Sequence, residues 1–125
     1  MDVNILVVDD SAAIRKILIR TLVQASLPIN QVFEAADGLE ALQIINTTNV
    51  RLVLSDINMP NMDGLQLLKQ LRNAPNWNEM SVVMITTEGS QTKVLEAVQL
   101  GAKGYLRKPF TADAIKEKVL SCLSS

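Results

Sequence analysis

The stretch RLVLSDINMPNMDG, residues 51–64, decides the fold of this chain. Its apolar run at residues 52–54 is too short for an ordinary helix and is typical of a strand buried on both faces of a parallel sheet. Asp56 follows at the carboxyl end of that strand, and Pro60 and Gly64 predict a sharply turning loop. Ligands bind open α/β sheets at this edge, so Asp56 is a candidate functional residue. Taken alone, an aspartate here would rather be read as a turn residue or a helix cap.

Two other strand ends carry charged side chains. Asp9 and Asp10 follow the apolar run of residues 5–8, and Lys108 follows a short strand late in the chain. The carboxyl ends of parallel strands meet at one edge of a sheet, so three carboxylates and one ammonium are expected to converge there.

The rest of the chain repeats the same unit of a strand followed by a helix. Capping-box spacing of Asp37 and Glu40 predicts the start of the second helix, and Ser90 is expected to cap the fourth. The fourth helix is expected to turn Val94, Ala97 and Val98 inward. Five such units predict an α/β fold, a parallel sheet with helices on both faces. The expected strands are 4–9, 31–35, 51–55, 82–86 and 104–107. The second strand has a short apolar run and is expected near the sheet edge.

Length and composition exclude several classes of protein. The 125 residues suit one domain, 1–125, and the net charge of −1 argues against DNA binding. No apolar run is long enough to span a membrane, and the N-terminus does not resemble a signal peptide. The single cysteine, Cys122, is expected to be a buried structural thiol in a cytoplasmic protein. Because the chain contains no histidine, any metal site must use oxygen ligands.

The predicted acidic cluster needs charge compensation. Unit charges about 4 Å apart repel by roughly 4 kcal/mol at an effective dielectric near 20. A Mg²⁺ ion, which prefers oxygen ligands, would provide this compensation for Asp9, Asp10 and Asp56. Without a metal, one of the carboxyl groups should have a raised pKa instead.

A carboxylate beside Mg²⁺ is suited to phosphoryl transfer. It can attack a phosphoryl group and become an aspartyl phosphate, which requires mainly positioning and charge neutralisation. Lys108 is placed to neutralise one phosphoryl oxygen, and Thr86, at the end of a neighbouring strand, offers a hydroxyl. Alone, Lys108 would be read as a solvated charge and Thr86 as an ordinary strand residue.

Five motifs in order resemble the receiver domain of two-component response regulators over essentially the whole length. They are VVDDS at 7–11, EAADGLEAL at 34–42, LSDINMPNMDG at 54–64, MITTEG at 84–89 and GAKGYLRKPF at 101–110. The resemblance implies a flavodoxin-like doubly wound sheet of five parallel strands in the order 2-1-3-4-5, with five helices.

The resemblance also implies roles for individual residues. Asp56 would accept the phosphoryl group. Asp10 would bind Mg²⁺ directly, Asp9 mainly through water, and Asn58 through its backbone carbonyl. Thr86 would donate a hydrogen bond to the phosphoryl group, and Lys108 would form an ion pair with it. The Lys108–Pro109 peptide would be cis, and Tyr105 would be a switch aromatic.

Within the family the chain looks most like the CheY-type receivers of chemotaxis. Asn58 and Glu88 match positions that tune phosphoryl lifetime there, and Tyr105 would swing inward as Thr86 moves. The moving surface would be the fourth helix, the fifth strand and the fifth helix. Trp77 is interpreted as a chance surface aromatic.

The implied function is a stand-alone switch rather than a turnover enzyme. Its implied partners are a sensor histidine kinase or phosphotransfer domain, a downstream protein such as a flagellar motor switch, and a phosphatase. Alternatives are a phosphorelay intermediate, a receiver cut from a larger regulator, and a phosphatase of the haloacid dehalogenase type. The last needs a second acid two positions after the nucleophile, where this chain has Asn58, which does not titrate. A flavin-binding module is disfavoured because Asp9 and Asp10 would repel its phosphate.

Overall fold

The structure is a computed structural model that describes residues 2–77, 80–87 and 91–123. Strands and helices alternate along the chain. The strands are β1 (Val3–Val8), β2 (Ile29–Ala35), β3 (Val50–Asp56), β4 (Ser81–Thr86) and β5 (Gly104–Arg107). The helices are α1 (Ala12–Gln24), α2 (Gly38–Thr47), α3 (Gly64–Asn73), α4 (Gln91–Gln99) and α5 (Ala112–Leu123).

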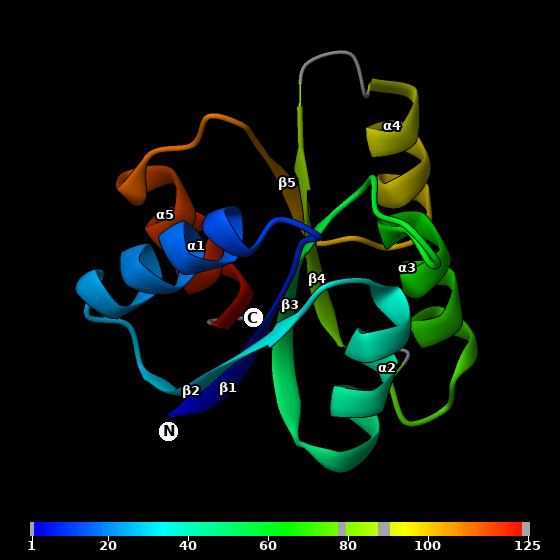
Figure 1. Cartoon of the computed structure of the whole chain (residues 1–125), viewed down its shortest axis with the longest axis horizontal. Coiled ribbons are helices and arrows are strands. Elements are labelled where there is room, and N and C mark those ends of the chain that lie inside the picture. Colours follow the sequence, from blue (N-terminus) through cyan, green and yellow to red (C-terminus); the bar gives the residue numbers. More distant parts are fainter. Residues whose placement is uncertain (1, 78–79, 88–90, 124–125) are drawn as a thin grey trace.

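The strands form one parallel sheet in the order β2-β1-β3-β4-β5. Helices α1 and α5 cover one face of this sheet, and α2, α3 and α4 cover the other (Figure 1). The predicted fold class and strand order are therefore confirmed, as is the edge position of the second strand. In the described part of the chain, none of the helices is long and apolar enough to cross a membrane.

Alternate residues of the central strands point into two separate cores. In β1, Leu6 and Val8 pack toward α2 and α3, whereas Ile5 and Val7 pack toward α1 and α5. All four side chains are fully buried. Burial on both faces explains why these strands are continuous apolar runs rather than alternating patterns.

Helix α4 differs from its sequence prediction. Ala97 is buried as expected, but Val98 is 48% exposed, so the prediction that it faces inward was wrong. Val98 lines a groove between α4 and β5 instead. Because β5 is the edge strand of the sheet, α4 packs near that edge and buries only a narrow stripe of its own surface. Ser90, the predicted cap, lies outside the described residues.

Trp77 and Cys122 both contact the interior. Trp77 is partly buried and packs against the core beneath α2, α3 and α4, so its interpretation as a chance surface aromatic was wrong. A lone tryptophan between polar loop residues gives no periodic signal of this packing. Cys122 is buried in the other core, as predicted.

Candidate functional site

Three carboxylates converge at the carboxyl edge of the sheet. Asp56 is the last residue of β3, and Asp9 and Asp10 follow β1, which pairs directly with β3. One oxygen from each carboxylate lies within 4.8 Å of the others. Asp9 is fully buried and Asp56 is 8% exposed, whereas Asp10 is exposed. The sequence prediction that these side chains share one site is confirmed.

Lys108 reaches this cluster from the loop after β5. Its ammonium lies 3.1 Å from Asp9 Oδ2 and 3.5 Å from Asp56 Oδ2, and its side chain is 18% exposed. The backbone N–H of Lys108 donates to the carbonyl of Thr86, which anchors the loop to the end of β4. The Lys108–Pro109 peptide is cis, as the resemblance implied.

The electrostatics of the cluster follow from burial and close charges. Burial is the main cause of the raised pKa of Asp56; the Lys108 charge opposes the rise and the Asp9 charge adds to it. Burial lowers the pKa of Lys108, but its hydrogen bond to Asp9 and the Asp56 charge outweigh burial, so this pKa is raised overall. The prediction that one carboxyl group would have a raised pKa is confirmed, although burial contributes more than repulsion between carboxylates.

The loop from β3 to α3 is held close to Asp56. Gly64 donates its N–H to the carbonyl of Ile57, and a Cβ on Gly64 would lie 2.3 Å from the Asp56 carbonyl oxygen. Asp63 and Gln66 then form a capping box that starts α3. Glycine is therefore required where α3 begins, because the backbone of β3 passes too close for any side chain.

Arg15 and Asn61 make contacts around the site that were not predicted from the sequence. Arg15 donates to the Asp9 carbonyl at 2.6 Å and to Glu34 Oε1 at 2.9 Å, which fixes the loop after β1. Asn61 donates to Asp37 Oδ2 at 2.7 Å, which ties the β3–α3 loop to the start of α2. Asp37 caps α2 as predicted, and the hydrogen bonds that it accepts from the Glu40 backbone N–H and from Asn61 lower its pKa.

Thr86 and Tyr105 lie on the groove side of the site. Thr86 is buried at the end of β4 and donates its hydroxyl to the Thr87 carbonyl at 3.1 Å. Tyr105 is 50% exposed on β5. Both residues line the groove between α4 and β5, together with Leu95 and Val98.

Asn58 follows Asp56 by two residues and is exposed. Its side-chain oxygen accepts a hydrogen bond of 2.6 Å from Lys93 on α4, which the sequence did not predict. Glu88, the other residue matched to phosphoryl lifetime, lies outside the described residues.

The donor atoms of the cluster suit a hard divalent cation. Asp9, Asp10 and Asp56 provide carboxylate oxygens, and Mg²⁺ is typically held by one or two carboxylates together with waters and phosphate oxygens. The partial exposure of the cluster leaves room for such ligands from outside the protein. The residues present therefore fit Mg²⁺.

Comparisons with known proteins agree with this geometry. A model of the response regulator receiver domain matches residues 5–120. The chain belongs to the response regulator receiver domain family. Receiver domains bind Mg²⁺ at an acidic site, and the cluster of Asp9, Asp10 and Asp56 has that character.

The similar proteins include CheY-type receivers. The chain is 37% identical over 123 residues to a chemotaxis protein CheY homolog of Campylobacter jejuni, covering 98% of this chain and 93% of that protein. It is 38% identical over 117 residues to CheY1 of Helicobacter pylori, covering 93% of each. The structure matches the chemotaxis response regulator CheY4 of Vibrio cholerae with a TM-score of 0.86 and 34% identity, covering 98% of this chain and 99% of that one.

Proposed function

We propose that this receiver accepts a phosphoryl group on Asp56, with Mg²⁺ bound, from the phosphohistidine of a sensor kinase or phosphotransfer domain. The observation that supports this most strongly is the single cluster in which Asp9, Asp10 and Asp56 lie within 4.8 Å and Lys108 lies 3.5 Å from Asp56. A nucleophile, oxygen ligands for a cation and a counter-charge meet there at the sheet edge where α/β folds bind ligands.

Asp56 is the nucleophile of the proposed reaction. One of its oxygens attacks phosphorus, and the bond from phosphorus to the donor imidazole nitrogen breaks. Because Asp56 must be ionised to attack, its raised pKa has to be countered by Lys108 and the bound cation. Bound Mg²⁺ supplies charge neutralisation at the phosphoryl oxygens.

The remaining site residues have supporting roles in this proposal. Asp10 and Asp56 would hold Mg²⁺ through their carboxylates, and Asp9 and the backbone carbonyl of Asn58 would also contribute to holding it. Lys108 pairs with a phosphoryl oxygen. The Thr86 hydroxyl, which donates to the Thr87 carbonyl in this structure, would turn to the phosphoryl group.

The proposed output is a change in a protein-binding surface. The groove between α4 and β5, about 650 Å³ in volume, is lined by Thr86 and Tyr105 as well as by exposed apolar side chains. Movement of Thr86 would let the Tyr105 ring turn inward and reshape this surface. The similarity to CheY-type proteins supports a downstream target in chemotaxis. In this proposal the protein acts in the cytoplasm, and a phosphatase is a further partner.

The same site supports a switch more than a turnover enzyme. Asn58 stands two positions after Asp56, where a haloacid dehalogenase-type phosphatase needs a titrating acid, and its side chain is bonded to Lys93. Asp56 would therefore be modified once and later dephosphorylated, without a separate substrate pocket being required.

Labelling with a small phosphodonor tests the proposal. We expect acetyl phosphate with Mg²⁺ to add one phosphoryl group to the wild-type protein, detected by intact mass and located on Asp56 by peptide analysis. Removal of Mg²⁺ and the Asp56→Asn substitution should each abolish labelling, because the first removes the counter-charge and the second the nucleophile. Full labelling of Asp56→Asn would refute the assignment, and an unreactive wild-type protein would count against the whole site.

A further inference from the structure

Helix α4 is held to the sheet by few apolar contacts. Ala97 is its one buried residue among those described, Val94 is partly buried, and Leu95 is 61% exposed. An element with so little buried apolar surface is expected to open more readily than the central strands. The polar contacts of α4 therefore contribute a larger share of the interactions that hold this helix in place.

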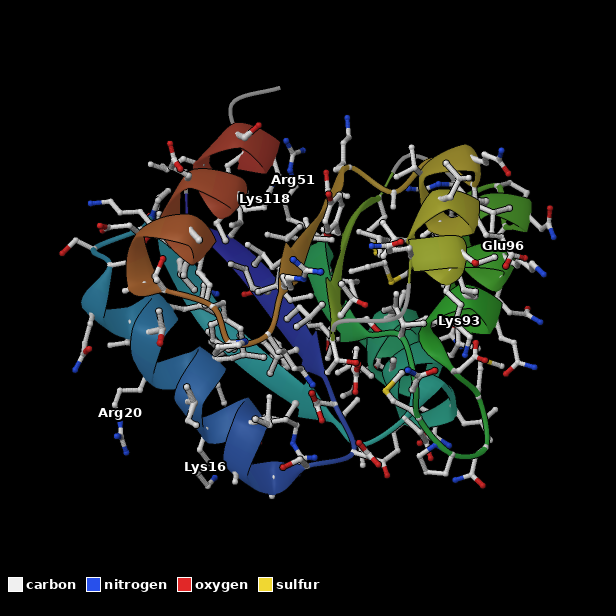
Figure 2. The ribbon with its side chains drawn as sticks, turned by 90° about the horizontal axis from the view of Figure 1, so that it is seen from above. Lys16, Arg20, Arg51, Lys93, Glu96 and Lys118 are labelled. Atoms are coloured by element: carbon white, nitrogen blue, oxygen red, sulfur yellow. The ribbon has the colours of Figure 1, made fainter. Side chains whose placement is uncertain are left out.

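Within the part of the chain that the structure describes, two side chains of α4 make such contacts, one turn apart. Lys93 Nζ donates to Asn58 Oδ1 at 2.6 Å, and Glu96 Oε1 lies 3.6 Å from Lys69 Nζ of α3. Figure 2 labels Lys93 and Glu96 on α4. The first contact reaches the loop after β3, and the second reaches a neighbouring helix, so the two contacts have different structural consequences.

The loop that receives Lys93 is the loop of the acidic site. Asn58 stands two residues after Asp56, and the intervening Ile57 is buried and donates its N–H to the Ile85 carbonyl of β4. The chain is held before Asp56 by the strand pairing of β3 and after Asp56 by this Ile57 bond. A displacement of Asn58 is therefore transmitted to Asp56. The Lys93 contact joins this segment to a residue 35 positions later in the sequence.

The position of Lys93 within its helix is unfavourable by itself. It is the third residue of α4, where the partial positive charge of a helix N-terminus disfavours a cation. The hydrogen bond to the side-chain oxygen of Asn58 offsets part of this cost. The contact to the loop thus explains a lysine that the helix alone would not favour.

We propose that Lys93 is a positioning residue that couples occupancy of the acidic site to helix α4 through the side chain of Asn58. This inference rests on the proposed Mg²⁺ site. Binding of the cation orders the loop that carries Asn58, and Lys93 passes that restraint to α4, one wall of the groove beside Tyr105. Because coupling between sites is reciprocal, a firmly placed α4 in turn favours cation binding.

Hydrogen exchange of the α4 amides provides the main test. We expect Mg²⁺ to slow exchange in wild-type α4 by about two- to fivefold, the range for one exposed charged contact. Lys93→Met removes the ammonium while keeping the stem, so this variant should lose the Mg²⁺ effect on α4. Lys93→Arg, which can still donate to Asn58, should retain it. Lys69→Met, which cuts the other contact of α4, should exchange faster overall yet keep the full response to Mg²⁺.

A double-mutant cycle without metal or phosphodonor tests the contact itself. Lys93→Met and Asn58→Ala remove the same bond, so their effects on the α4 opening equilibrium should be non-additive. The interaction between them should be a factor of about two to five, as for the Mg²⁺ effect. Additive effects would overturn the contact, and an unchanged Mg²⁺ response in Lys93→Met would overturn the positioning role. A wild-type α4 that does not respond to Mg²⁺ would also overturn it. Failure of the proposed function is read separately, as absent labelling of Asp56.

Discussion

The ammonium of Lys108 contacts Asp9 and Asp56 at once, and the metal-free cluster depends on this counter-charge. We expect Lys108→Ala to lower the free energy of unfolding by about 1–2 kcal/mol without Mg²⁺, since the carboxylates then repel one another without compensation. Labelling of Asp56 by acetyl phosphate should fall much further, by about 100-fold, because the loss is greatest when charge develops on the phosphoryl group. Urea unfolding and labelling rates measure the two effects.

Lys116→Ala is the matched control for this substitution, because Lys116 is an exposed lysine of α5. It should change neither quantity appreciably. Complete unfolding of Lys108→Ala would show that Lys108 is mainly structural, contrary to this interpretation.

The candidate site could be predicted at the residue scale where topology alone decides it. Asp9, Asp10 and Lys108 follow strands and Asp56 ends one, and parallel strand ends meet at one edge whatever the side-chain details. Arg15 and Lys93 were missed because their contacts depend on where long side chains on helices reach. Spacing within one helix gives no information about a loop on another part of the chain.

At the scale of elements, the start of α3 depends on Gly64. A Cβ there would lie 2.3 Å from the Asp56 carbonyl oxygen, so Gly64→Ala must displace backbone. We expect a loss of about 1–3 kcal/mol in the free energy of unfolding, and weaker Mg²⁺ binding because the displaced strand end carries Asp56. Chemical denaturation and calorimetric titration measure these two quantities.

Gly104→Ala provides the comparison. The nearest atoms to its added Cβ belong to the flexible Lys118 side chain, at 3.2 Å and beyond, so this chain can move aside. It should cost less than 1 kcal/mol, roughly the range of β-propensity. Equal costs at the two glycines would contradict the close-approach argument.

Arg72 joins three elements at the opposite end of the molecule. Its guanidinium donates to the carbonyls of Met80, Leu100 and Gly101, and burial lowers its pKa. Arg72→Lys cannot reproduce this planar fork, so we expect a loss of about 1–3 kcal/mol. Urea unfolding measures the loss, and labelling of Asp56 should be nearly unchanged because the site is at the other edge.

Arg20→Lys is a suitable control for the change from guanidinium to ammonium, since Arg20 is exposed on α1. A loss at Arg20 as large as that at Arg72 would show that the effect is not specific to the three carbonyls.

Sequence patterns predicted the elements well where burial was complete and less well where it was partial. The strands β1, β3 and β4, which are buried over most of their length, gave unbroken apolar runs at their buried residues. In contrast, Val98 was misassigned because α4 lies near an edge of the sheet and buries only a narrow stripe. Trp77 was misassigned because its contacts come from distant segments, which no local pattern records.

At the scale of the whole molecule, the acidic cluster links folding to metal binding. A cation that binds only the folded state stabilises it by about 2.7 kcal/mol at a concentration 100 times its dissociation constant. We therefore expect the thermal midpoint to rise with Mg²⁺ concentration in the wild-type protein. Asp10→Asn should weaken this rise strongly, and Asp113→Asn, an acid in the first turn of α5, should leave it intact. A rise that is identical in all three proteins would indicate nonspecific ion effects.

The free energy of unfolding should also depend on pH because of the acidic cluster. The pKa of Asp56 is raised above its ordinary value of 3.8. The folded metal-free protein thus holds this proton more tightly than the unfolded chain does. Stability should therefore fall as pH rises from the ordinary carboxyl pKa through the raised one, and stay level above it as far as this group is concerned. Bound Mg²⁺ favours the ionised carboxylate and should reduce that fall.

The most direct test is an NMR titration of the Asp56 carboxyl carbon with and without Mg²⁺. Asp56 is buried and lies beside Asp9, so its metal-free pKa should lie above the ordinary aspartate value. It should drop when Mg²⁺ is added, because the cation favours the charged form. A metal-free pKa at or below the ordinary value, together with no response to Mg²⁺, would contradict the account of a charge-compensated acidic site at Asp56.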